Sequence, residues 1–196
     1  MPQGTMRSWR GCAKIGPLVA MAGALLASAA ILHELGRVFV CTCGRVRLWA
    51  GGVHTPDNSQ QLSDWYSFSH IIHGMLFFAL LWLVARRLPL LWRLAIAVVI
   101  ECGWEILENS PLIIERYRQA TIAIGYTGDS ILNSLSDVAM MALGFLIAAR
   151  LPWRWTAALA IAMEVMTLLI IRDNLTLNVI MLAWPIEAIR QWQAGI

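Results

Sequence analysis

Apolar residues form five long runs that short polar segments separate. The runs are 15–35, 66–85, 90–107, 130–149 and 155–171. A helix needs roughly 20 mostly apolar residues to cross a bilayer, and each run is about that long. The chain is 59% hydrophobic and only 14% charged, whereas soluble domains carry about 25% charged residues. The pattern predicts an all-α integral membrane protein, a single domain with a bundle of about five transmembrane helices.

The polar segments predict how these helices are connected. Residues 36–65 form the longest connection, an expected outer loop, and 112–128 form a second outer segment. Ser63 or Asp64 is expected to cap the second helix, and Gly128-Asp129 the fourth, because short polar side chains satisfy free N–H groups at helix starts. Pro111 is expected to end the third helix.

The C-terminal segment, 172–196, repeats apolar residues at helical spacing. Val179, Leu182, Ile186 and Ile189 fall on one face, opposite Glu187. We expect an amphipathic helix lying in the outer interface. A sixth span is the alternative, and it would place the C-terminus on the other side of the membrane.

Basic residues indicate which side of the membrane each connection occupies. Arginine and lysine without any acidic residue occur in the tail 1–14 and in the two short turns: Arg7, Arg10, Lys14, Arg86, Arg87, Arg93, Arg150 and Arg154. Short cytoplasmic segments are enriched in such residues. The N-terminus is therefore predicted to be cytoplasmic. The first run also resembles a secretory signal that ends near 27–29, but its length favours an uncleaved helix.

Three of the predicted helices carry ionisable residues that a bilayer disfavours. One charge at the centre of a span costs about 2.5–3.5 kcal/mol on insertion scales. The residues are His70 and His73 on the second helix, Glu101, Glu105 and Glu108 on the third, and Asp129, Asn133 and Asp137 on the fourth. Spacings of three or four residues place each set on one helix face. With alternating helix directions, all three sets fall in the outer half of the bilayer, which predicts a shared cavity.

Two chemistries suit such a cavity. Imidazole and carboxylate groups bind zinc and other divalent ions, and a further carboxylate then serves as a base toward metal-bound water. In this hypothesis His70 and His73, with Glu105 or Asp137, hold the ion, while Glu101 or Glu108 handles protons. Alternatively, closely spaced carboxylates and histidines relay protons in a carrier.

Several of these residues also suit purely structural roles. The glutamates are also suited to pairing with Arg116, Arg118 or the histidines, and Asp129 to a helix cap. Glu164, alone on the fifth helix, joins the cavity or pairs locally. Asp173, Asn174 and Asn178 form either a polar rim over the site or an interfacial turn.

The outer loop contains Cys41 and Cys43, separated by one residue. A bridge between them, a metal site with His54, and two free thiols all remain open, with free thiols the default. The net charge of +3 forms no basic stripe with interleaved aromatics, so nucleic acid is not an expected partner.

Several long segments carry a family resemblance. They are Cys41-Thr-Cys-Gly44, Asp64-Trp-Tyr-Ser-Phe-Ser-His-Ile-Ile-His-Gly74, Trp104-Glu-Ile-Leu-Glu-Asn-Ser-Pro111, Gly128-Asp-Ser-Ile-Leu-Asn-Ser-Leu-Ser-Asp137 and Arg172-Asp-Asn-Leu-Thr-Leu-Asn178. They resemble a bacterial membrane family known as a domain of unknown function, DUF family 2585, a UPF-type membrane protein. The resemblance implies a bacterial inner-membrane location and supplies no activity. VanZ-like and YjdF-like membrane proteins share a looser pattern of histidine, glutamate and aspartate on successive helices.

These observations lead to three functional hypotheses. The first is a membrane-embedded enzyme, with a divalent metal as candidate cofactor, that acts on a lipid-linked or envelope substrate from the periplasmic side. The second is a proton-coupled carrier of small solutes, and the third a structural or assembly partner in the membrane. Polar residues are nearly absent from the inner half of the second to fourth helices, which weighs against a carrier.

Overall fold

The computed structural model describes residues 5–195 without 122 and 124. In this part of the chain all regular secondary structure is α-helical. Of residues 5–14 only the backbone is described, so the side chains of Arg7, Arg10 and Lys14 lie outside the described part. The eight helices are α1 (Thr5–Glu34), α2 (Ser67–Ala85), α3 (Leu90–Glu108), α4 (Pro111–Ala120), α5 (Ile131–Arg150), α6 (Trp153–Ile171), α7 (Leu175–Ala183) and α8 (Glu187–Ala194). The first helix thus begins ten residues earlier than the predicted run.

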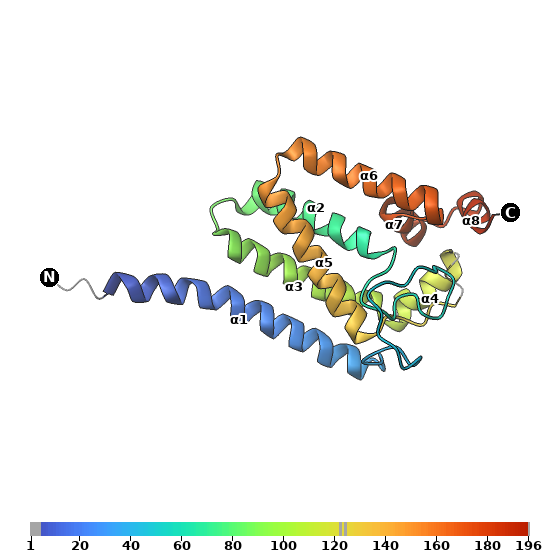
Figure 1. The fold of residues 1–196 in the computed structure, drawn as a ribbon, viewed down its shortest axis with the longest axis horizontal. Helices are drawn as coiled ribbons and strands as arrows, with labels where there is room; N and C mark the ends of the chain where they lie inside the picture. Colours follow the sequence, from blue (N-terminus) through green and yellow to red (C-terminus); the bar gives the residue numbers. More distant parts are fainter. Residues whose placement is uncertain (1–4, 122, 124, 196) are drawn as a thin grey trace.

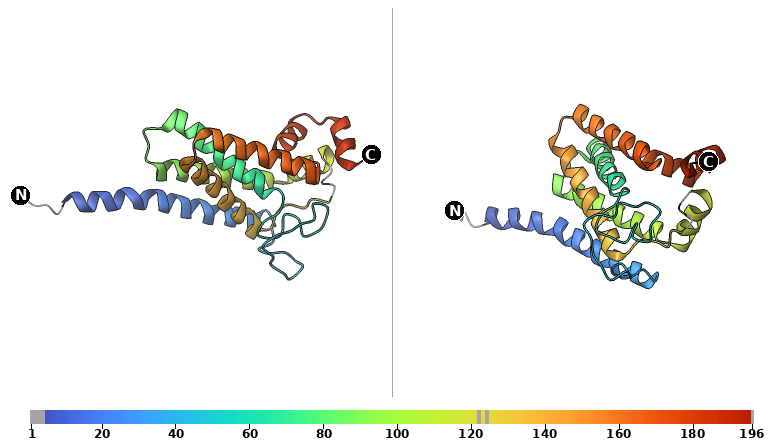
Figure 2. Two further views of the ribbon diagram at one scale, coloured as in Figure 1. Left: turned by 45° about the horizontal axis from the view of Figure 1, so that its top comes forward. Right: turned by 45° about the vertical axis from the view of Figure 1, so that its right-hand side comes forward.

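Five long helices lie side by side and alternate in direction (Figures 1 and 2). The short connections 86–89 and 151–152 lie at one end of the bundle, which we call the turn end. The other end, the loop end, holds the long loop 35–66 together with α4, α7 and α8 (Figure 1). Polar connecting segments are therefore concentrated at one end of the molecule.

Four helices are long and apolar enough to cross a membrane. They contain the segments Ile15–Glu34, Ser67–Ala85, Ile131–Arg150 and Trp153–Ile171. This indicates a multi-pass membrane protein. The fifth predicted span coincides with α3 to within one residue, but α3 is not among these four because it carries too many charged residues, Arg93 and three glutamates.

The C-terminal segment is divided into two helices, where one amphipathic helix or a sixth span was expected. It forms two short helices, α7 and α8, of nine and eight residues, with Pro185 between them. At about 1.5 Å per residue neither is long enough to cross a bilayer. The proline lacks the backbone N–H and restricts the residue before it, so one continuous amphipathic helix does not form.

The third helix ends before Pro111, as expected, because α3 stops at Glu108. Pro111 then begins α4, where Ser110 caps the new helix and accepts a hydrogen bond from the Ile113 N–H. Two expected helix caps are wrong. α5 is capped by Ser130 and not by Asp129, and no side chain caps α2, whose N-cap residue is Tyr66.

The closest helix pair is α2 and α5, which meet through two glycines. A Cβ atom at Gly74 would lie 1.9 Å from the Met141 carbonyl oxygen, and one at Gly144 would lie 1.9 Å from the Ile71 carbonyl oxygen. Small residues permit this approach of two backbones in membrane proteins. Around the contact, Met141 and Phe145 are completely buried in an apolar core with Leu81 and Val98.

We expect Gly74→Ala or Gly144→Ala to destabilise the protein by about 3 kcal/mol, because the methyl group meets backbone that cannot move aside without separating α2 from α5. Gly103→Ala is the matched control, since nothing lies within 4 Å of its added Cβ. There the higher helix propensity of alanine favours a gain of up to about 1 kcal/mol. Thermal unfolding in detergent measures both, and equal effects at Gly74 and Gly103 would contradict the packing argument.

Candidate functional site

Two histidines of α2 contact one glutamate of α3 in the interior of the bundle. His70 Nδ1 lies 2.6 Å from Glu101 Oε1, and His73 Nδ1 lies 3.1 Å from the same oxygen. Glu101 is completely buried and His70 nearly so. The contact fixes the orientation of the His70 ring, whose Nδ1 is also 3.5 Å from Glu105 Oε1.

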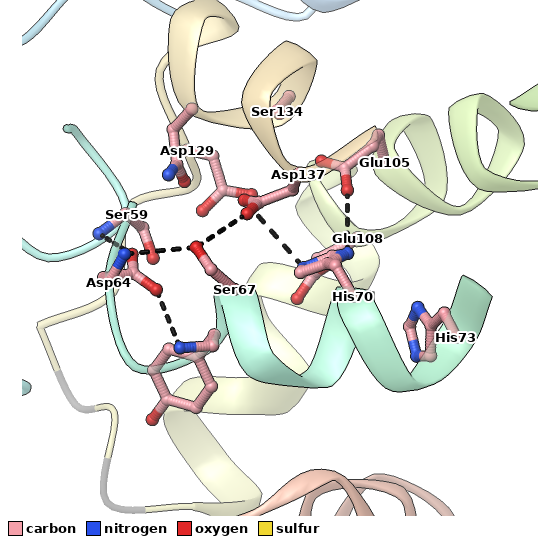
Figure 3. Close-up of polar contacts among 12 residues, drawn as sticks. Ser59, Asp64, Ser67, His70, His73, Glu105, Glu108, Asp129, Ser134 and Asp137 are labelled. Carbon is pink, nitrogen blue, oxygen red and sulfur yellow. Dashed lines mark hydrogen bonds and ion pairs between the residues drawn. The ribbon is translucent and has the colours of Figure 1, made fainter. Parts of the chain in front are cut away.

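The second ring nitrogen of His70, Nε2, points toward α5. His70 Nε2 lies 3.9 Å from Asp137 Oδ2, while Asp137 Oδ1 accepts a hydrogen bond from Ser67 Oγ at 3.1 Å. Ser67 Oγ in turn accepts the Asp64 N–H. Figure 3 shows this chain of contacts running from Asp64 to His70 and on to Glu105. The residues come from the loop, α2, α3 and α5, so four segments contribute to one connected group.

Asp64 and Asp129 are buried anchors of the two loop segments nearest to the site. The Asp64 carboxylate accepts the N–H groups of Ser59 and Tyr66. Asp129 accepts hydrogen bonds from Asn109 Nδ2 at 2.9 Å and from the Tyr126 hydroxyl at 3.0 Å. Burial raises the pKa of both aspartates, because the protein interior solvates a charged carboxylate less well than water does and so favours the neutral form.

Asn109 joins the end of α3 to the start of α5. It is completely buried. Its Nδ2 also donates to the Glu105 carbonyl, and its Oδ1 accepts the Asp129 N–H at 2.7 Å. Asn133, one turn into α5, donates from Nδ2 to the Gln61 carbonyl. The side-chain amides of Asn109 and Asn133 therefore hold loop segments to the ends of α3 and α5.

Glu108 pairs with a tyrosine and not with an arginine. The Tyr117 hydroxyl of α4 donates to Glu108 Oε1 at 2.9 Å. Arg116 instead donates to the Leu182 carbonyl, and Arg118 to the Tyr126 carbonyl. The expected pairs of Arg116 or Arg118 with these glutamates are therefore not formed, whereas the expected alternative, pairing with the histidines, is formed at Glu101.

Asp173 anchors the short C-terminal helices over the site. Its carboxylate accepts hydrogen bonds from the Tyr66 hydroxyl, Asn178 Nδ2 and Gln193 Nε2 at 3.0–3.2 Å, and from the Asn174 N–H at 2.9 Å. Burial raises the pKa of Asp173 to about 6. Asn174 caps α7 by accepting the Leu177 N–H. Asp173 and Asn178 line a cavity at the loop end, whereas Asn174 belongs to the turn that begins α7.

Glu164 has a local structural partner. Its carboxylate accepts hydrogen bonds from the N–H groups of Leu175 and Thr176 and from the Thr176 hydroxyl. A carboxylate at a helix N-terminus is favourable because the free N–H groups there carry partial positive charge. Glu164 therefore secures α7 to α6 and is not part of the cavity.

A cavity of about 670 Å³ opens among these groups at the loop end. Five carboxylates line it, together with His70 and three tyrosines: Asp64, Glu108, Asp129, Asp137, Asp173, Tyr66, Tyr117 and Tyr126. Its rim includes the exposed residues Thr42, His54 and Thr55. Glu101, Glu105 and His73 lie behind this lining. The ionisable residues predicted on the three helices therefore divide into a group that lines the cavity and a group that lies behind it.

The carboxylates of this site are not paired with arginine or lysine, although Arg37 lines the cavity and donates to the backbone carbonyls of Leu35 and Thr127. None of the ion pairs in the described part of the chain joins an arginine or lysine to these carboxylates. Both carboxylate oxygens of Glu105 are buried without a hydrogen-bond partner, and so is Glu101 Oε2. A buried ionised group without a partner is strongly disfavoured, so a site of this kind takes up a cation or protons.

Two sets of three side chains have the arrangement of metal ligands. His70, Glu105 and Glu108 each offer a ligand atom, and these atoms lie within 4.8 Å of one another. His70, His73 and Glu101 form the second set with the same spacing. The first set reaches the cavity through His70 and Glu108, and the second set through His70 alone. Nitrogen and oxygen ligands of this kind suit zinc and other divalent transition metals.

Sequence comparison places this architecture in a known family. The family described as "Protein of unknown function (DUF2585)" matches residues 32–195. The chain belongs to the DUF2585 family. It is 58% identical to a UPF0314 protein of Rhizobium etli over 91% of both chains. It is 59% identical to a UPF0314 protein of Sphingopyxis alaskensis over 94% of this chain and 98% of the relative. No solved structure matches the chain.

Helical spacing predicted the histidines and most of the acids of this DUF2585 site. Asp64 was expected to be a helix cap, and Ser67, Tyr66, Tyr117 and Tyr126 were not predicted. Ser67 precedes His70 by three residues, so its position on the same face of α2 was available from spacing alone. The tyrosines reach the cavity from loop and helix ends whose direction no periodicity reveals.

Asp173 predicts a measurable pH dependence of stability. Because its pKa is raised from 3.8 to about 6, its contribution to stability is present below pH 3.8 and is lost as the pH rises through about 6. In Asp173→Asn that loss is absent. Asn178 Oδ1 and Gln193 Oε1, both buried and without partners, are then available to accept from the new amide. We expect the stability of Asp173→Asn relative to wild type to improve by about 1 kcal/mol between pH 5 and pH 8.

Thermal unfolding in detergent at several pH values measures this difference. Glu115→Gln, which removes an exposed carboxylate of α4, is the control and should follow the wild-type pH dependence. Parallel curves for wild type and Asp173→Asn would show that the Asp173 carboxyl does not titrate in this range.

Proposed function

We propose that this protein is a membrane-embedded, metal-dependent enzyme that acts on the polar part of a lipid-linked or envelope substrate. The observation that carries the proposal is the completely buried Glu105 carboxylate, which has no hydrogen-bond partner and lies beside His70. A divalent cation bound there would compensate the negative charge of Glu105, which is not paired with an arginine or lysine.

His70, Glu105 and Glu108 are the proposed ligands. Hydrogen bonding of His70 Nδ1 to Glu101 fixes the tautomer and orientation of the ring, and it leaves Nε2, which faces Asp137 at 3.9 Å, as the ring nitrogen free to bind a cation. Glu101 is then a positioning residue. This differs from the assignment expected from sequence, in which His73 was a ligand, because His73 lies behind the cavity lining and shares the Glu101 oxygen with His70.

Asp137 is the proposed general base. It lines the cavity, its Oδ2 faces His70 at 3.9 Å, and Ser67 fixes its other oxygen. A divalent ion lowers the pKa of a bound water, and a carboxylate in this position can accept the proton that the water loses. This arrangement of residues supports hydrolysis, in which water attacks the carbonyl group of an ester or the phosphoryl group of a phosphoester.

The position of the cavity supports a substrate held in the membrane. It opens at the loop end, where the candidate spans finish and where Trp49 and Trp65 pack edge to face at 5.2 Å. Tryptophan side chains favour the level of the lipid headgroups. The arginines of the two short turns favour a cytoplasmic turn end, so the cavity would face the periplasm of a bacterial inner membrane.

The carrier hypothesis has less support. Below the polar group the interior is an apolar core, with Leu81, Val98, Met141 and Phe145 buried together. A carrier requires polar access from both sides, and this core closes the turn-end half of the bundle. A purely structural role would favour a closed polar core, whereas the cavity reaches the buried His70 and Asp137.

We expect the protein purified in detergent to contain about one divalent metal ion per chain, or to bind one Zn²⁺ or Mn²⁺ per chain on titration. His70→Ala and Glu105→Gln should lose this ion. Glu101→Gln should weaken binding by about 10- to 100-fold, the usual effect of losing the partner of a ligating histidine. Elemental analysis and isothermal titration measure both effects, with His33→Ala, an exposed histidine of α1, as the control.

Wild-type protein without metal and without affinity for Zn²⁺ or Mn²⁺ would overturn the metal assignment. The enzyme assignment has a separate test. Proteoliposomes containing a bacterial envelope lipid extract should show metal-dependent loss of one lipid class by mass spectrometry, and Asp137→Asn should abolish the loss while retaining the ion. A product formed equally by Asp137→Asn would exclude Asp137 as the base.

A further inference from the structure

The two loop cysteines form a second group of potential ligands, separate from the His70 cluster. Cys41 and Cys43 are joined in a disulfide in the structure, which resolves the alternatives left open by the sequence. The Asp57 carboxylate lies beside them, with Oδ1 3.9 Å from Cys41 Sγ. His54, the partner considered from sequence, lines the cavity instead. Sulfur and oxygen atoms of Cys41, Cys43 and Asp57 lie within 4.8 Å of one another.

Both sulfur atoms already receive N–H groups from the surrounding loop. The Cys43 backbone N–H points to Cys41 Sγ at 3.2 Å, and Gln61 Nε2 lies 3.6 Å from Cys43 Sγ. Gln61 is completely buried and its Oε1 accepts the Arg47 N–H at 2.7 Å, so its side chain is held in place. Donors directed at sulfur stabilise the negative charge of a thiolate. The surroundings of the pair therefore suit thiolates as well as the disulfide.

Asp57 is oriented by a separate ion pair. Arg47 Nη1 lies 3.0 Å from Asp57 Oδ2, which leaves Oδ1 on the side of Cys41. A carboxylate fixed through one oxygen and free at the other is the usual arrangement for a metal ligand with a supporting partner. Two backbone hydrogen bonds between 47–50 and 62–63 hold this part of the loop together. The geometry is thus supported by bonds within the loop and by the start of α5, where Asn133 donates to the Gln61 carbonyl.

We propose that the reduced form of this loop is a Zn²⁺ site, with Cys41, Cys43 and Asp57 as ligands, and that the disulfide closes it. Two thiolates and one carboxylate match the ligand preference of zinc, and a fourth position remains for water. Thr42, between the two cysteines, lines the cavity, so the redox state of the pair alters the wall of that cavity.

Opening the site requires a thiol reductant. A dithiol such as dithiothreitol breaks the Cys41–Cys43 bond, gives up two electrons and two protons to the two sulfurs, and becomes a cyclic disulfide itself. Binding of Zn²⁺ then releases the two thiol protons. Oxidation reverses both steps and expels the ion. The site is independent of the His70 cluster, which contains no cysteine and should bind its ion in both redox states.

The test compares Zn²⁺ stoichiometry in oxidised and reduced full-length protein, after removal of excess reductant under anaerobic conditions. Reduced wild type should bind one more Zn²⁺ per chain than oxidised wild type. The Cys41→Ser/Cys43→Ser variant should show no difference between the two states. Cys102→Ala, which removes the buried free thiol of α3, is the matched control and should retain the difference.

Asp57→Asn provides a variant that keeps both cysteines. It should still gain Zn²⁺ on reduction, with an affinity lowered by about tenfold or more, because one charged ligand is replaced by a neutral one. Equal stoichiometry in oxidised and reduced wild type would overturn the proposal. So would a difference that persists in Cys41→Ser/Cys43→Ser or disappears in Cys102→Ala. Glu105→Gln should retain the difference, which separates this site from the one under Proposed function.

Discussion

Two histidines share one carboxylate oxygen of Glu101, and this contact determines how the remaining site is arranged. It fixes His70 between α3 and α5, with one ring nitrogen toward the glutamates and the other toward Asp137. The surrounding acids are more numerous than the histidines that could compensate them. Because the interior has a low dielectric constant, this imbalance has a large energetic effect and favours a bound cation. The candidate chemistry follows from the imbalance and not from any single residue.

The backbone makes this juxtaposition possible. Gly74 lies one turn beyond His70 on α2, and Gly144 lies two turns beyond Asp137 on α5. Their missing side chains let the two helices approach so closely that a Cβ at either position would overlap the opposite backbone. A wider separation of α2 from α5 would move Asp137 away from His70 and separate Ser67 Oγ from its acceptor. The close packing of α2 and α5, which Gly74 and Gly144 permit, therefore also sets the distances between the charged groups of the site.

Much of this arrangement could be anticipated from the sequence. Run lengths predicted the long helices, and the spacing of Glu101, Glu105 and Asp137 predicted that their faces would meet at one level. Spacing along a helix could not show which carboxylates would face the cavity, because that depends on helix rotation within the bundle. Nor could it show the bonds of Asp129 and Asp173, whose partners Asn109 and Gln193 each lie 20 residues away in the sequence. At Asp129 the local signal suggested a cap, and tertiary hydrogen bonds replaced it.

The separation of polar and apolar regions along the bundle explains why a site at one end is compatible with stability in a membrane. At the turn end, Met141 and Phe145 pack in an apolar core that needs no polar partner. At the loop end, the acids lie within reach of loops, short helices and a cavity, where water and ions have access. Moving the same carboxylates two turns deeper would place them in that core without donors. A polar site in this fold is therefore confined to the loop end, the end from which a headgroup or a metal ion can arrive.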